Sequence, residues 1–194
     1  KKKPFIFYKH DHVVLILERN FCIVLNDPRR FGLVEVIYYK NLYKNNHFKY
    51  LGVEPLTSNF CSQYLRKILY RKKTNIKSLL LNQKLIAGLG NIYTCESLYE
   101  SGISPLKIAS SLSKRQISIL CAKIKKVLKH AINSKGSSIN NYKSPMGILG
   151  KFQNKFKVYN REGKSCRNRN CKEKITRIII SGRSSYYCKN CQKV

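Results

Sequence analysis

The amino-acid sequence predicts an α+β fold built from three consecutive segments. Residues 5–40 carry β-branched and apolar runs with the spacing of strands, whereas residues 63–134 repeat their apolar side chains with a helical period. The last segment, 151–194, holds two pairs of cysteines on either side of a stretch typical of a β hairpin. We therefore expect strands first, then helices, and then a small hairpin held by a metal.

The charge of the chain favours a polyanionic partner. Lys and Arg number 39 against 9 Asp and Glu, which gives a formal net charge of +30. Nucleic acid is the leading partner class, and an anionic membrane surface is the second. A coding sequence rich in A and T would explain the many lysines, but it would not explain why acids are scarce. No apolar run reaches the ~18 residues of a transmembrane helix, and the start does not resemble a secretory signal. We expect a cytosolic, reducing compartment, in which paired cysteines indicate metal binding.

In the first segment, two strands are expected at "HVVLILE" (12–18) and "FCIVLN" (21–26), joined by a turn at residues 19–20. A further strand is expected at "LVEVIYY" (33–39), followed by a loop or linker over residues 40–50. Between them, "DPRRFG" places two guanidinium groups and an aromatic ring, Arg29, Arg30 and Phe31, directly after a turn. An aromatic side chain on such a loop suits insertion into a base stack.

In the helical segment, Ser113 and Gln116 form a capping box, and the residues after them form one apolar face. Gly136 is placed to end that helix. "GLGN" (88–91) predicts a tight turn that joins two helices, with Asn91 at a helix start. Exposed backbone N–H groups there suit a phosphate, although Gly-Asn turns are common. Residues 137–150 are expected to form a loop, and "KFKVYNREG" (155–163) a strand.

The terminal cysteines predict one structural zinc ion. Their pattern is C-x4-C, 16 residues, and C-x2-C, which allows all four sulfurs to reach one tetrahedral metal. The ligands are Cys166, Cys171, Cys188 and Cys191. For Cys22, Cys61, Cys95 and Cys121 we expect buried apolar packing instead. The hairpin should turn near Ser181-Gly182, which puts Arg183 at its tip, either as a phosphate contact or as an ordinary solvated side chain.

A basic run lies just before the glycine turn. Its cations are Arg71, Lys72, Lys73 and Lys77. A run of this kind is usually a solvated face, and the residues alone do not raise it above that interpretation.

Five pieces in this order, "KHDHV", "DPRRFG", "KTNIK", "AGLGNIY" and the four-cysteine tail, resemble the formamidopyrimidine-DNA glycosylase family over essentially the whole chain. The resemblance implies the C-terminal part of a β-sandwich domain (1–45), a linker (46–53), a helix–two-turn–helix DNA-binding domain (54–150) and a zinc finger (151–194). It implies a monomeric base-excision repair enzyme that acts on oxidised purines, such as 8-oxoguanine and formamidopyrimidines, in duplex DNA. Such an enzyme cuts the N-glycosidic bond and then the strand through a Schiff base.

The resemblance also implies roles for single residues. His10, Arg29 and Lys72 match DNA contacts, with Arg29 against the orphaned base and Phe31 in the gap of the stack. Lys77 and Asn91 would hold phosphates around the flipped nucleotide, and Arg183 would serve the late elimination step or bind phosphate. Residues 137–150 fall at the lesion-capping loop.

Two departures from the family pattern stand out. The first cysteine pair is spaced by four residues where two is usual, and the Pro-Glu start that carries the nucleophile and the acid is not in this sequence. Whether the chain acts as an enzyme is therefore left open. The alternatives are an inactive DNA-binding fragment and an oxidised-pyrimidine glycosylase of the endonuclease VIII group, against which "DPRRFG" argues.

Overall fold

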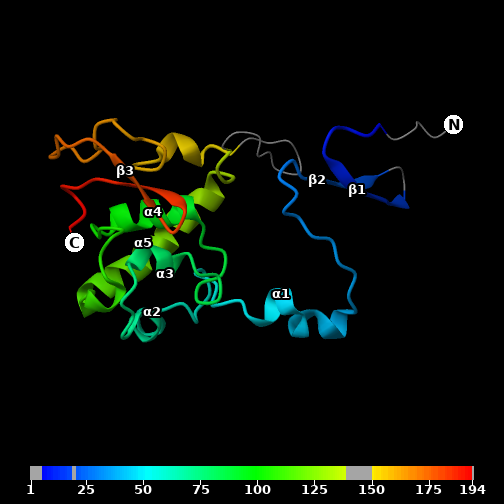
Figure 1. The fold of residues 1–194 in the computed structure, drawn as a ribbon, viewed down its shortest axis with the longest axis horizontal. Helices are drawn as coiled ribbons and strands as arrows, with labels where there is room; N and C mark the ends of the chain where they lie inside the picture. Colours follow the sequence, from blue (N-terminus) through cyan, green and yellow to red (C-terminus); the bar gives the residue numbers. More distant parts are fainter. Residues whose placement is uncertain (1–5, 19–20, 139–149, 194) are drawn as a thin grey trace. The chain divides into compact units, whose positions relative to one another are not determined.

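The computed structural model describes residues 6–18, 21–138 and 150–193, and the chain divides into two compact units, Lys1–Asn45 and Asn46–Val194 (Figure 1). The first unit contains β1 (Asp11–Ile16), β2 (Cys22–Asn26) and the 3-10 helix η2 (Tyr39–Lys44). The second contains α1 (Asn46–Lys49), α2 (Ser62–Leu69), α3 (Ile76–Leu80), α4 (Asn91–Glu100), η3 (Ala109–Ser111), α5 (Lys114–Asn133), η4 (Phe152–Lys155), β3 (Thr176–Ile180) and β4 (Arg183–Tyr187). The α+β class is confirmed.

The first unit is an antiparallel hairpin followed by irregular chain. β1 and β2 pair from Asp11 opposite Asn26 to Ile16 opposite Cys22, with an irregularity between Asp11 and Val13. This confirms the first two expected strands, while the turn between them lies outside the described residues. Apolar side chains on both strands remain exposed, including Ile16 at 78%.

The expected strand at 33–39 is wrong. Residues 33–38 have no regular structure, and Val36 is 97% exposed. A strand needs a neighbour for its N–H and C=O groups, and no strand among the described residues pairs with this one. The loop expected at 40–50 is also corrected, because the chain there forms η2 and α1.

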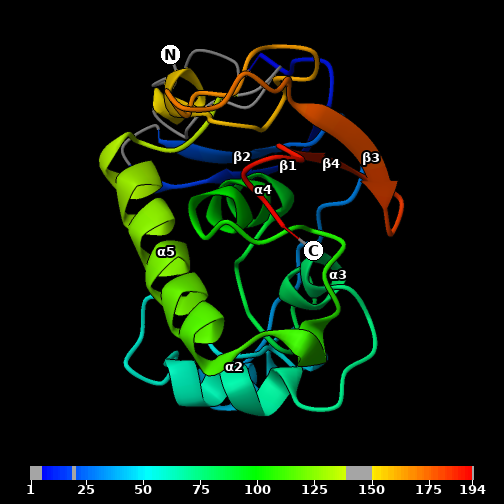
Figure 2. The same cartoon turned by 90° about the vertical axis from the view of Figure 1, so that its left-hand side faces the viewer.

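The second unit is organised around α4. This helix packs against α3, against the long helix α5 and against β4, and α5 also packs against α2 (Figure 2). The main core of the second unit consists of buried apolar side chains from its helices and the segments between them. They are Phe60, Leu65, Leu69, Ile76, Leu79, Leu80, Ile86, Leu89, Leu98, Ile103, Ala109, Leu112, Ile117, Leu120, Cys121 and Ile124. The predicted apolar face of α5 is therefore the face that the core covers.

The ends of α5 follow from sequence-local hydrogen bonds. The Ser113 side chain accepts from the Gln116 N–H, and the Gln116 side chain accepts from the Ser113 N–H, so the predicted capping box is confirmed. At the other end, Gly136 adopts a φ of 80° and donates its N–H to the Ala131 carbonyl at 2.8 Å. A left-handed residue after the last turn satisfies a carbonyl that would otherwise lack a partner.

The C-terminal hairpin has the predicted strands and turn. β3 and β4 pair from Thr176 opposite Tyr187 to Ile180 opposite Arg183. The two turn residues, Ser181 and Gly182, have φ values of 50° and 70°. Two consecutive positive φ values are the signature of a tight turn whose twist matches that of the flanking strands.

The strand expected at 155–163 is wrong for a specific reason. The chain forms η4 up to Lys155 and then runs irregularly. The N–H groups of residues 157, 158 and 159 donate to the side chain of Glu96 instead of to a neighbouring strand. A side chain from α4 has thus replaced the ladder partner.

Among the described helices, none combines the length and the continuous apolar character required to span a bilayer. Most of the expected lesion-capping loop, residues 139–149, lies outside the described residues.

Replacing Leu120 with alanine should lower the free energy of unfolding by about 2–5 kcal/mol, because Leu120 is fully buried and alanine leaves a cavity in the core. Ile132→Ala on the same helix is the matched control, since Ile132 is 61% exposed, and its cost should stay within about 0.5 kcal/mol. Urea unfolding followed by circular dichroism measures both values. Equal costs would contradict the assignment of the buried face.

Candidate functional site

The four terminal cysteines converge at one point, as expected. The sulfurs of Cys166, Cys171, Cys188 and Cys191 all lie within 4.8 Å of one another. Cys166 and Cys191 are 3.8 Å apart at their sulfurs, and Cys171 and Cys188 are 3.6 Å apart. Four thiolates at about 2.3 Å from one tetrahedral zinc would be separated by about 3.8 Å. The cluster therefore fits zinc, and the four-residue spacing of the first pair does not prevent it.

Polar groups surround these sulfurs. The side-chain amides of Asn168 and Asn190 donate to Cys191 and Cys171 at 3.4 and 3.3 Å, and the Tyr99 hydroxyl lies 3.1 Å from the Cys166 sulfur. The hydrogen bond from Asn190 lowers the pKa of Cys171 to about 7, whereas burial raises the pKa of Cys188 to about 12. A bound cation would favour the thiolate form of both sulfurs. With all four positions taken by sulfur, the zinc is structural.

The other cysteines are not all alike. Cys95 and Cys121 are buried, as expected for apolar packing. Cys22 is exposed on β2, which corrects the expectation. Cys61 is half-buried and caps α2, because its sulfur accepts from the Tyr64 N–H at 3.5 Å.

A second constellation joins two helices to the hairpin. The Lys77 ammonium group on α3 donates to the Ser185 hydroxyl at 2.5 Å and to the Ser184 carbonyl at 3.3 Å. The Asn91 amide, at the first residue of α4, donates to the same Ser184 carbonyl at 2.9 Å. Ser184 directly follows Arg183, which is exposed at the start of β4. The structure therefore brings Lys77 and Asn91 together beside Arg183.

Lys77 is fully buried, with a relative exposure of 0%. Burial lowers the pKa of Lys77, and the neighbouring Arg183 lowers it further, against the opposite influence of Cys95. Within the described part of the chain, the ammonium group bonds only to the neutral oxygens of Ser184 and Ser185. A positive charge in such a place favours an anion nearby.

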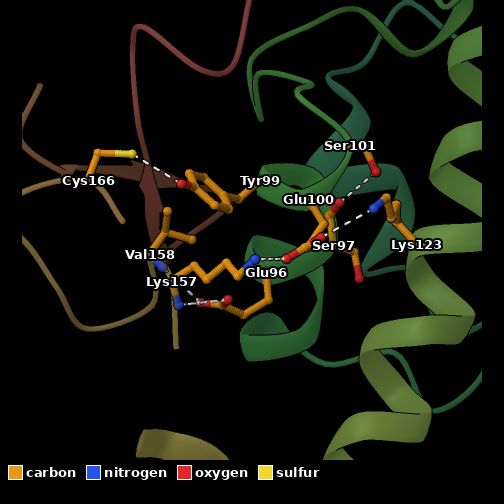
Figure 3. Close-up of polar contacts among 9 residues, drawn as sticks. All are labelled: Glu96, Ser97, Tyr99, Glu100, Ser101, Lys123, Lys157, Val158 and Cys166. Carbon is orange, nitrogen blue, oxygen red and sulfur yellow. Dashed lines mark hydrogen bonds and ion pairs between the residues drawn. The ribbon is translucent and has the colours of Figure 1, made fainter. Parts of the chain in front are cut away.

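A buried carboxylate holds the segment that leads into the zinc finger, residues 157–159, which we name the finger root. Glu96 is 3% exposed, and its Oε1 accepts from the N–H groups of Val158 and Tyr159 at 3.0 and 2.8 Å. Its Oε2 accepts from the Lys157 N–H at 2.9 Å (Figure 3). Burial raises the pKa of Glu96, and these N–H groups oppose that shift.

Two neighbours on α4 contact the same region. The Glu100 carboxylate forms ion pairs with the ammonium groups of Lys157 and, at 3.3 Å, of Lys123 on α5. Tyr99 reaches the Cys166 sulfur (Figure 3). Burial alone would raise the pKa of Glu100, but the two lysines hold it below its usual range.

The loop after β2 in the first unit is shaped by Asp27. Its carboxylate accepts from the Arg29 N–H at 3.0 Å and from the Gly32 N–H at 2.5 Å. The Gly32 N–H is the largest of the contributions that lower the pKa of Asp27. The Arg29 guanidinium carbon lies 4.9 Å from the centre of the Phe31 ring, and that ring is 79% exposed. The loop therefore presents an arginine and an aromatic ring outward as a pair.

The remaining expected site residues occupy separate places. His10 and Arg30 lie in the first unit with φ values of 78° and 55°. The His10 carbonyl accepts from the Asp27 N–H at 2.9 Å, so this residue braces the same loop. Lys72 is exposed in the turn between α2 and α3.

Sequence reasoning missed Glu96, Tyr99 and Ser185. Glu96 had a detectable signal, since it is one of only 9 acids and falls among apolar residues of an expected helix. Tyr99 and Ser185 had no signal of that kind, because their roles depend on which segment packs against them.

The fold and the cysteine centre define a helical domain joined to a four-cysteine zinc finger. Residues 51–143 match the formamidopyrimidine-DNA glycosylase H2TH domain, and residues 163–194 match the zinc finger found in FPG and IleRS. The formamidopyrimidine-DNA glycosylase of Zymomonas mobilis is 42% identical over 193 residues, which cover 100% of this chain and 70% of the relative. The one from the Wolbachia of Drosophila simulans is 47% identical, over 95% of this chain and 66% of the relative.

Solved structures agree. The crystal structure of MutM (Fpg) from Thermus thermophilus has a TM-score of 0.89 at 32% identity, covering 96% of this chain and 70% of that one. The Lactococcus lactis Fpg in complex with abasic-site DNA has a TM-score of 0.88 at 34% identity, covering 100% and 69%. The chain belongs to the formamidopyrimidine-DNA glycosylase family, and it spans about two thirds of the length of these relatives.

The protein should contain one zinc ion per chain. Cys171→Ala should abolish stoichiometric zinc, because three sulfurs cannot complete the tetrahedral set. Cys22→Ala is the control, since Cys22 lies exposed on β2 and outside the cluster, and it should keep the metal. Elemental analysis of protein purified without chelator measures both, and wild-type protein without zinc would refute the site.

Proposed function

We propose that this chain is the DNA-gripping part of a base-excision repair DNA glycosylase and AP lyase that acts on oxidised purines in duplex DNA. Membership of the family supports the activity class, and its relatives with solved structures are named as complexes with Fapy-dG, abasic-site and carbocyclic 8-oxo-G DNA. The net charge of +30 supports a polyanionic partner. DNA is proposed to bind to a single copy of the chain, in a bacterial cytosol at the nucleoid.

One observation carries this proposal. Lys77 of α3 and Asn91 of α4 both donate to the Ser184 carbonyl, next to Arg183 of the hairpin. Three residues that are far apart in sequence thus meet where the helical domain and the finger join. A cluster of cationic and amide donors, in a chain with only 9 acids, suits the phosphates of a nucleic acid.

Each of these residues is assigned a role. Arg183, exposed at the tip of the finger, binds a phosphate beside the flipped nucleotide and serves the late elimination step. Asn91 and Lys77 stabilise the start of β4 next to Arg183. The buried Lys77 also contributes its positive charge beneath that strand. Lys72, exposed after α2, contacts the DNA backbone farther along.

The loop of the first unit is proposed to act on the opposite strand. Phe31 would fill the gap left by the flipped nucleotide, since its ring is already exposed, and Arg29 would pair with the orphaned base. Arg30 and His10 would contact the DNA near this loop. We also propose the domain boundaries 1–45, 46–53 as linker, 54–150 and 151–194.

Two other functions remain in competition. These 194 residues could bind damaged DNA without cutting it, or they could act on oxidised pyrimidines in the manner of endonuclease VIII. The Arg-Arg-Phe sequence of residues 29–31 favours the purine-directed function. Borohydride trapping on an 8-oxoguanine duplex distinguishes a lyase from a chain that only binds DNA. Only a lyase forms the covalent Schiff-base adduct that borohydride traps.

The proposed DNA binding is tested by measuring the affinity for duplex DNA that carries a tetrahydrofuran abasic analogue opposite cytosine. The chain should bind it at least about tenfold more tightly than undamaged duplex, since an unpaired site costs less to open. Arg183→Ala should weaken binding and make the slope of log K against log salt shallower by about one, as for one lost phosphate contact.

Arg115→Ala is the matched control, an exposed arginine at the start of α5, and it should leave the slope unchanged. Equal affinity of the wild-type chain for damaged and undamaged duplex would contradict the proposed function. An unchanged slope in Arg183→Ala would contradict the role of that arginine.

A further inference from the structure

One face of α4 is directed at the finger. Glu96, Tyr99 and Glu100 are spaced i, i+3 and i+4, so they lie on the same side of the helix. Glu96 takes the N–H groups of the finger root, Tyr99 contacts the Cys166 sulfur, and Glu100 pairs with the Lys157 ammonium group. All three contacts lead to the chain that enters the zinc centre (Figure 3).

Glu96 and the finger root depend on each other. A buried carboxylate is costly unless it is hydrogen-bonded, and backbone N–H groups without a partner are costly as well. Here the carboxylate, 3% exposed, accepts all three N–H groups of residues 157–159 at 2.8 to 3.1 Å. If the finger root moves, the carboxylate loses its donors and the N–H groups lose their acceptor. The contact therefore fixes where the finger leaves the helical domain.

The same helix also fixes the hairpin of the finger. Asn91 starts α4 and donates to the Ser184 carbonyl, and Glu96 lies five residues farther along. One rigid element thus holds the finger at its root and beside its tip. We propose that Glu96 is a positioning residue that sets the place of Arg183 for phosphate binding, an inference that rests on the proposed function.

The test compares the full chain as wild type, Glu96→Gln and Glu100→Gln. Glutamine keeps the size of Glu96 but turns an amide N–H2 toward N–H groups that need an acceptor. Glu96→Gln should weaken binding to the tetrahydrofuran duplex about tenfold or more at ~0.1 M salt. The slope of log K against log salt should become shallower by about one, because Arg183 loses its place. Zinc should remain at one per chain.

Glu100→Gln is the matched control, with the same charge change on the same helix. Its partners are the side chains of Lys123 and Lys157, which are 30% and 43% exposed, so binding should change by less than about twofold. Equal losses in both variants would overturn the proposal. So would a Glu96→Gln protein that melts at a lower temperature yet keeps the wild-type slope, since a merely structural role predicts that result.

A second variant tests the proposal if Glu96→Gln does not fold. Glu96→Asp keeps the charge but is one methylene shorter, so it should show an intermediate loss of affinity with zinc retained. Wild-type affinity and slope in this variant would overturn the proposal.

Transfer of zinc to a colorimetric chelator provides a readout that does not depend on DNA. Zinc should leave Glu96→Gln several-fold faster than wild type, because the segment before Cys166 is no longer seated. If wild type fails to prefer damaged duplex while this acceleration is seen, the proposed function is wrong, although Glu96 still seats the finger root against α4. If wild type prefers damaged duplex and Glu96→Gln changes neither slope nor zinc transfer, the positioning role is wrong.

Discussion

A single carboxylate buried against three backbone N–H groups determines how the C-terminal finger is joined to the helices. Burying Glu96 to 3% exposure without those donors would be costly, and residues 157–159 would leave buried N–H groups without a partner if that acceptor were absent. The contact is lost if the finger root moves away from α4. Zinc folds the finger, but Glu96 decides where the folded finger sits.

This placement explains why α4 lies at the centre of the second unit. The helix contacts α3, α5 and β4, so it meets a different element on each of its sides. Asn91 at its start meets the hairpin, Glu96 meets the finger root, and Tyr99 reaches the metal cluster. Lys77 then becomes fully buried beneath β4. The proposed phosphate binding by Arg183 therefore depends on the residues that join the helices to the finger. Arg183 is only the exposed residue of that group.

Local signals in the sequence predicted much of this arrangement. The capping box at Ser113 and the Ser181-Gly182 turn are determined by residues within a few positions of one another, and each cysteine pair is similarly close in sequence. The strands expected at 33–39 and 155–163 failed, because a strand depends on a partner that local pattern does not reveal. An acid within an apolar helix marked Glu96 as unusual, but its partner could not be predicted, because that partner is a segment some sixty residues away.

Native-state hydrogen exchange at the amides of residues 157–159 tests the central claim most directly. If Glu96 holds the finger root, these irregular residues should exchange as slowly as core amides of α5, such as those of Leu120 and Ile124, because their opening requires exposing a buried carboxylate. Exchange at the rate of exposed loops, with the α5 core still protected, would show that the carboxylate does not fix the finger and would contradict the account.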